Sequence, residues 1–195
     1  MKILVARSPE EIEQAYEKLS RAENIGCDTE TSGLSPQQAR LLSVQFSDGE
    51  FNVLVPASEG VGLGRLRELL TDPAKRVIFH NARFDLAFLR ANGYPTRNVF
   101  CTMIAEKLLT KGADQSASLA DTLYRYFAVD LEKSHRTKFT RNWNGIWTKD
   151  LVDYALADVF YLPKLMQEQS LAMERLGMTE DFRGQMDKLL NQHAL

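Results

Sequence analysis

The sequence has little of what marks a secreted or membrane-spanning protein. It contains only two cysteines, Cys27 and Cys101, which give no disulfide framework. No apolar run approaches the ~18 residues that cross a bilayer, and the N-terminus holds too short an apolar segment for a secretory signal. We therefore expect a protein of the reducing cytoplasm with no membrane partner.

Excess charge of one sign is also absent. The formal net charge is −2, and the apolar and charged fractions of 44% and 26% are those of an ordinary globular protein. A chain that is not basic overall can still carry a local nucleic-acid surface, so the total charge excludes neither class of partner. The length of 195 residues, without repeats or low-complexity segments, predicts one domain over 1–195.

Strand-like runs come first in the chain and helical spacing follows, and this order predicts an α/β fold with a mixed sheet flanked by helices. Ser8 and Pro9 followed by Glu11 are typical of a capped helix start, and residues 47–50 of a hairpin turn. The predicted strands are 3–5, 25–30, 41–46, 51–56 and 76–79. The predicted helices are 9–21, 63–70, 82–89, 103–109, 119–127, 151–176 and a C-terminal helix over about 179–191.

Two carboxylates lie two positions apart at the end of the second apolar run. Because side chains alternate along a strand, Asp28 and Glu30 project from one face, with Cys27 and Thr29 on the other. Like charges on one face are unfavourable unless a cation compensates them. Oxygen ligands suit a hard divalent ion such as Mg²⁺ or Mn²⁺. The alternative is a solvated strand edge.

Two more carboxylates and a tyrosine occur in similar surroundings. Asp85 stands just inside the helix that follows strand 76–79, before an apolar stretch. Tyr154 and Asp158 are four residues apart on an apolar helix, hence on one face. A buried carboxylate there needs a partner or a metal ion. For Asp85 the alternative is a first-turn acid favoured by the helix dipole, and for Asp158 it is a hydrogen bond to Tyr154.

Residues 133–149 combine basic and aromatic side chains with no acid among them. Basic groups can contact phosphates while aromatic rings stack on bases, which is how single strands are held without sequence readout. The alternative, equally supported, is a loop that packs its tryptophans into the core. The side chains concerned are Lys133, Arg136, Lys138, Phe139, Arg141, Trp143, Trp147 and Lys149.

Three segments, taken in order, resemble the motifs of the DEDD 3′–5′ exonucleases. They are 28–34 with Asp28-x-Glu30, 81–85 with Asn81-x-x-Phe84-Asp85, and 154–158 with Tyr154-x-x-x-Asp158. A tyrosine four residues before the last aspartate is typical of the Tyr branch, and Ser118-Leu119-Ala120 is similar to the ribonuclease D group. The resemblance implies a ribonuclease H-like fold in a single domain.

The resemblance also implies chemistry by two divalent metal ions, Mg²⁺ or Mn²⁺. Asp28 would bridge the two ions, with Glu30 and Asp158 on the ion that activates water. Asp85 would support the second ion through water, and Tyr154 would orient the attacking water. Hydrolysis of the terminal phosphodiester bond is the reaction that such a set implies.

The family pattern assigns further residues to the terminal nucleotide. Leu34 would act as an apolar wedge against its base, and packing within the domain is the alternative for Thr31, Leu34, Asn81 and Phe84. For His80 the other interpretations are a metal ligand and a histidine bonded within the protein core. The predicted substrate-binding residues are Thr31, Leu34, His80, Asn81, Phe84 and Lys133.

The expected function is a metal-dependent 3′–5′ exonuclease that acts on the 3′ ends of single-stranded RNA or DNA. RNA is the favoured substrate, and the products are nucleoside 5′-monophosphates. One alternative is a DNA-preferring exonuclease similar to a polymerase proofreading domain or a Werner-type enzyme. Another, from a different class, is a non-catalytic nucleic-acid-binding module that retains the fold. The oligomeric state stays open between monomer and homodimer.

Overall fold

A mixed sheet of six strands lies at the centre of the computed structural model, which describes residues 2–111, 113–131, 138–140 and 142–192. The strand order is β1-β4-β3-β2-β5-β6, and β3 runs antiparallel to both of its neighbours while the other pairs are parallel. This confirms the predicted α/β class. The strands are β1 (Lys2–Val5), β2 (Asn24–Thr31), β3 (Leu41–Ser47), β4 (Phe51–Val55), β5 (Arg76–Phe79) and β6 (Val99–Cys101).

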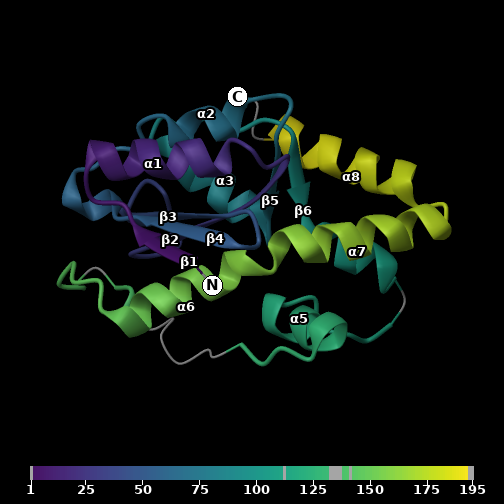
Figure 1. The fold of residues 1–195 in the computed structure, drawn as a ribbon. Helices are drawn as coiled ribbons and strands as arrows, with labels where there is room; N and C mark the ends of the chain where they lie inside the picture. The colour runs from purple at the N-terminus through teal and green to yellow at the C-terminus, as the bar shows by residue number, and fades with distance from the viewer. Residues whose placement is uncertain (1, 112, 132–137, 141, 193–195) are drawn as a thin grey trace.

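Helices cover both faces of the sheet (Figure 1). The first layer is formed by α1 and α3, with α2 packed on α1, and the second by α6 and α7. None of the described helices combines the length and apolar character that a bilayer crossing requires. The helices are α1 (Pro9–Leu19), η1 (Ala57–Glu59), α2 (Leu66–Thr71), α3 (Ala82–Ala91), α4 (Thr102–Leu109), α5 (Leu119–Phe127), α6 (Lys149–Phe160), α7 (Leu162–Arg175) and α8 (Thr179–Gln192).

Two local signals in the sequence form as predicted. The Ser8 hydroxyl accepts a hydrogen bond from the Glu11 amide, and the Glu11 carboxylate accepts one from the Ser8 amide, which completes a capping box. In the β3–β4 turn, Asp48 Oδ1 accepts from the amides of Glu50 and Phe51 at 2.8 and 2.7 Å. These bonds fix the start of α1 and the register of the hairpin.

Two features of the helical half differ from the prediction. The apolar run 151–176 forms two helices, α6 and α7, because Pro163 has no amide hydrogen to continue the backbone ladder. The strand β6 was not predicted, since its three residues are too few to show a period.

The C-terminal helix α8 packs on the chain's own core. Met186 and Leu189 are buried in the same apolar cluster as α1 and α3, and the Phe182 ring lies 4.6 Å from that of Phe100. Oligomerisation through this helix was one interpretation of the sequence and packing on its own domain the other, and packing is the one observed. The predicted range, about 179–191, agrees closely with Thr179–Gln192.

Gly26 lets the corner between α6 and α7 lie directly against β2. A Cβ atom at this position would be 2.7 Å from the Val159 carbonyl oxygen and 3.1 Å from Leu162 Cβ. Side chains do not tolerate a backbone oxygen at such a distance, so any larger residue must push the corner outward. Because Asp158 precedes Val159, the same contact sets how far Asp158 lies from β2.

We predict that Gly26→Ala lowers the free energy of unfolding by about 1–3 kcal/mol, the usual cost of overpacking. Chemical denaturation followed by circular dichroism measures it. The matched control is Gly184→Ala in α8, where no atom lies within 4 Å of the added carbon. The free energy of unfolding of this control should rise by roughly 0.5–1 kcal/mol, because alanine has a higher helix propensity than glycine. Equal stability of Gly26→Ala and the parent chain would contradict the close contact.

Candidate functional site

Three acidic side chains converge where α6 packs against β2. Asp28 and Glu30 come from one face of β2 and Asp158 from α6, and each offers a carboxylate oxygen within 4.8 Å of the others. All three side chains are partly buried. Residues that are distant in the sequence thus form a group of oxygen ligands of the kind that binds a hard divalent cation.

Asp85 lies beside this group, at the edge of β2. The parallel ladder between β2 and β5 ends at Gly26, so no described strand pairs with the later residues of β2 on that side. Asp85, from the first turn of α3, takes that place: its Oδ1 accepts from the Thr29 amide at 3.1 Å and from the Thr29 hydroxyl at 2.7 Å. Asp85 is 2% exposed, and it satisfies a backbone donor that would otherwise be buried and unpaired.

The carboxylates disfavour one another's ionisation. Burial and the charges of Asp85, Asp158 and Glu30 raise the pKa of Asp28 well above its usual range. Burial also raises the pKa of Asp85 to about 7, although the hydrogen bonds from Thr29 oppose this. A bound cation would therefore stabilise the ionised carboxylates of this site. A donor set made only of carboxylate oxygens fits Mg²⁺ or Mn²⁺.

Tyr154 lies one turn before Asp158 on α6 and is held by an aromatic cluster. Its ring is 6.2 Å from that of Phe139, and the rings of Phe139 and Trp147 are 5.5 Å apart. Phe139 and Trp147 are each 7% exposed. Buried rings are not free to stack on bases, so for these two residues the packing interpretation of segment 133–149 is the one observed.

The turn after β2 presents an apolar side chain to solvent. Leu34 is 82% exposed, whereas a leucine that served only packing would be buried. Thr31 is partly buried and its hydroxyl donates to the Gly33 carbonyl at 2.8 Å, which holds the turn that carries Leu34. A bulge between Glu30 and Thr31 bends the strand at this point.

Residues of the second motif lie at the start of α3. Asn81 has a left-handed backbone, with φ of 68°, and its side chain is exposed. Phe84 is partly buried with its ring 5.0 Å from that of Phe88, so it belongs in part to the core. Lys133, the remaining residue of the predicted substrate-binding set apart from His80, lies outside the described residues.

Both ring nitrogens of His80 are hydrogen-bonded within the protein. Nδ1 is 2.8 Å from the Thr102 hydroxyl and Nε2 is 2.9 Å from the Ala117 carbonyl oxygen. Burial lowers the pKa of His80 to about 4, so the ring is neutral at physiological pH. These bonds favour the structural interpretation of His80, and contact with substrate stays a prediction.

Sequence reasoning missed a polar row on β3, next to the carboxylates. Ser43, Gln45 and Ser47 are fully buried and alternate with the apolar residues Val44 and Phe46. Asp28 pairs with Gln45 across the strands, and Glu30 pairs with Ser43. The period of two among these polar residues was the available signal, because a buried strand face is normally apolar.

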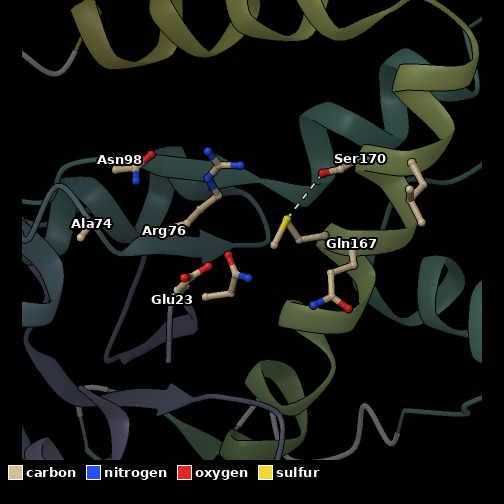
Figure 2. Close-up of a pocket in the computed structure, with 9 residues that line it drawn as sticks. Glu23, Ala74, Arg76, Asn98, Gln167 and Ser170 are labelled. Carbon is tan, nitrogen blue, oxygen red and sulfur yellow. Dashed lines mark hydrogen bonds between the residues drawn. The ribbon is translucent and has the colours of Figure 1, made fainter. Parts of the chain in front are cut away.

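A separate cavity of about 570 Å³ lies at the opposite end of β2, away from the carboxylates. Figure 2 shows the side chains that line it, from Glu23 beside the start of β2, Arg76 at the start of β5, and Gln167 and Ser170 on α7. None of the predicted site residues that the structure describes lines this cavity. Its volume alone therefore does not mark the site.

Comparison with known proteins identifies the family to which the fold and the three motifs correspond. The family model that matches this chain describes a 3′–5′ exonuclease, and the match covers residues 4–174. A relative by sequence is DNA polymerase I of Aquifex aeolicus, which is 28% identical over 157 residues. That alignment covers 80% of this chain and 25% of the polymerase. The chain spans a quarter or less of the length of the relatives it matches by sequence.

Two solved structures are similar over most of this chain. NrnC of Brucella melitensis bound to pGG has a TM-score of 0.77 at 29% identity, with 89% of this chain and 84% of that chain covered. NrnC has also been solved with bound Mg²⁺. Escherichia coli RNase D, described as an exoribonuclease involved in structured RNA processing, has a TM-score of 0.87 at 21% identity. The aligned region covers 100% of this chain and 51% of the RNase D chain. At 21% identity this likeness is evidence for a shared fold and for nothing further.

The raised pKa values predict that stability falls with pH in the metal-free protein. Protonated Asp28 and Asp85 favour the folded state below the unfolded pKa of about 4, and this contribution is lost as pH rises through about 7, the pKa of folded Asp85. Metal binding needs the deprotonated carboxylates, so Mn²⁺ should raise Tm more at pH 8 than at pH 6. At a free Mn²⁺ concentration of ten times Kd, the free energy of unfolding should rise by about 1.4 kcal/mol, which raises Tm by roughly 3–6 °C.

Thermal unfolding with and without Mn²⁺ measures this effect. Asp28→Asn should raise the Tm of the metal-free protein at pH 8 and remove most of the Mn²⁺ response. The matched control is Asp153→Asn on the same helix, which loses only a surface ion pair with Lys149. A Mn²⁺ response that is equal at both pH values, or unchanged in Asp28→Asn, would contradict the assignment.

Proposed function

The chain belongs to the 3′–5′ exonuclease family, and on that premise we propose that it removes nucleotides from the 3′ ends of single-stranded nucleic acid. The observation that carries the proposal is the group formed by Asp28, Glu30 and Asp158, with Asp85 at its edge. These are the acidic positions of the three family motifs. A non-catalytic module is disfavoured because all four acids are present.

Two divalent ions, Mg²⁺ or Mn²⁺, fit this donor set. Asp28 would bind both of them, because its carboxylate interacts with those of Glu30 and Asp158 and also with that of Asp85. Bound ions of this kind supply an activated water and stabilise charge on the leaving oxygen. Tyr154 lies one turn from Asp158 with its ring beside that of Phe139, and its hydroxyl would orient the water.

We infer that the terminal nucleotide lies against the loop after β2 and the start of α3. The exposed Leu34 offers an apolar surface against which a base can pack. The exposed amide of Asn81 and the ring of Phe84 come from the neighbouring α3. No base-reading motif stands among the described residues here, so we expect little sequence specificity.

RNA is the proposed natural substrate class. The support is the likeness to NrnC, which was solved bound to pGG. The runner-up, a DNA-preferring enzyme, is supported by the likeness to DNA polymerase I. Extension of the exonuclease domain over residues 1–195, a cytoplasmic location, and a monomeric or homodimeric state stay predictions.

We predict that Asp28→Ala abolishes metal-dependent shortening of a 5′-labelled RNA oligonucleotide. Loss of one shared ligand should remove about 4 kcal/mol of transition-state stabilisation, a rate decrease of roughly 10³-fold. EDTA should have the same effect on the parent chain, and Asp153→Asn should keep the parent rate. Gel resolution of the products measures all of these. A folded and active Asp28→Ala protein would refute the assigned role.

A second experiment separates the substrate classes. We expect faster release of nucleoside monophosphates from single-stranded RNA and from pGG than from DNA of matched sequence, and no cleavage when the 3′ hydroxyl is blocked. Initial rates at equal concentrations in Mg²⁺ and in Mn²⁺ give the comparison. A consistent preference for DNA would establish the runner-up instead.

A further inference from the structure

We propose that Gln45, held by Ser43, is a positioning residue whose side-chain amide orients the Asp28 carboxylate for metal binding. The inference rests on the proposed metal site and names a residue outside the family's acidic motifs. Three observations support it: the strand register, a buried amide oxygen of Gln45 that has no partner among the described residues, and the short distance from Gln45 to Ser43.

The register places Gln45 directly opposite Asp28. In the antiparallel ladder between β2 and β3, Asp28 pairs with Gln45, and Glu30 pairs with Ser43. Directly opposite side chains point to the same face, with Cβ atoms about 4.5–5.5 Å apart. The amide of Gln45 is therefore within reach of the Asp28 carboxylate. The face they share is covered by α6, which carries Asp158.

Burial of the Gln45 side-chain amide lowers stability unless both its oxygen and its nitrogen are hydrogen-bonded. Gln45 has no exposed surface, yet its Oε1 has no hydrogen-bond partner among the described residues. A buried polar atom without a partner costs about 1–3 kcal/mol. The same face of β3 would accept an apolar residue, as the opposite face does at Val44 and Phe46. A buried amide here thus indicates a purpose other than packing.

The contact with Ser43 indicates which end of the amide lies there. Gln45 Nε2 and the Ser43 hydroxyl oxygen are 2.5 Å apart. Bonds from an amide nitrogen to oxygen measure about 2.7–3.2 Å, whereas bonds between two oxygens measure about 2.5–3.0 Å. Rotation of the amide by 180° places Oε1 on the Ser43 hydroxyl, which then donates. The same rotation turns the two N–H donors toward the position of the orphaned atom.

A carboxylate is the acceptor that those donors need, and Asp28 is the residue opposite. A hydrogen bond from Nε2 would hold the Asp28 carboxylate in one orientation without adding charge. Residues that hydrogen-bond a metal-ligating carboxylate typically contribute 10–100-fold in metal affinity. Gln45 therefore acts on the metal through Asp28.

The test is a titration of the full chain with Mn²⁺ in the absence of nucleic acid. The electron paramagnetic resonance signal of the free ion measures how much Mn²⁺ stays unbound. Gln45→Met keeps the unbranched shape and removes the amide, and it should weaken Mn²⁺ binding 10–100-fold. The control is Asn52→Leu, which removes another fully buried amide with an orphaned oxygen, on β4 and paired with Ser47. It should keep the Mn²⁺ affinity within twofold. Circular dichroism and thermal unfolding confirm that each variant is folded.

A folded Gln45→Met protein with parent Mn²⁺ affinity would overturn the proposal, and so would equal weakening in Asn52→Leu. If Gln45→Met does not fold, Ser43→Ala decides: it frees the amide and should weaken Mn²⁺ binding severalfold, and an unchanged affinity would overturn the proposal. A parent chain that binds no Mn²⁺ would overturn both the site and the role of Gln45. A parent chain that binds Mn²⁺ but cuts no nucleic acid would refute the proposed function alone.

Discussion

The close approach of the α6–α7 corner to β2 at Gly26 is the contact on which the site depends. The absence of a side chain at Gly26 lets the backbone of Val159 lie against the strand, and Asp158 is the residue just before it. Two positions beyond Gly26 on the same strand face stands Asp28. One packing contact therefore brings together carboxylates that are 130 residues apart in the chain.

Grouping these acids on a covered sheet face costs stability, and the surrounding structure limits the cost. Asp85 is stabilised by two hydrogen bonds from Thr29, at a strand edge where no neighbouring strand competes. The polar row on β3 replaces the apolar surface that a buried strand normally shows. A bound cation would offset the remaining repulsion among the carboxylates, so these residues favour cation binding at the expense of stability in the metal-free protein.

The residues around the site divide into those that hold it and those that face solvent. The rings of Phe139 and Trp147 are buried and support Tyr154, and His80 bonds to Thr102 and to a loop carbonyl. Leu34, in contrast, is open to solvent. The carboxylates and aromatic rings are thus packed within the protein, whereas Leu34, the residue proposed to contact the nucleotide, is exposed.

The sequence by itself determined the elements and the motifs, because local spacing sets them: alternation put Asp28 and Glu30 on one strand face, and helical period aligned Tyr154 with Asp158. It missed β6 and the break at Pro163, and it left the roles of His80 and Phe139 open. Only the tertiary structure decided that three acids meet while Asp85 caps the edge of β2, and that Gln45 stands opposite Asp28. Strand order, register and ladder length are long-range pairings, which local spacing does not encode.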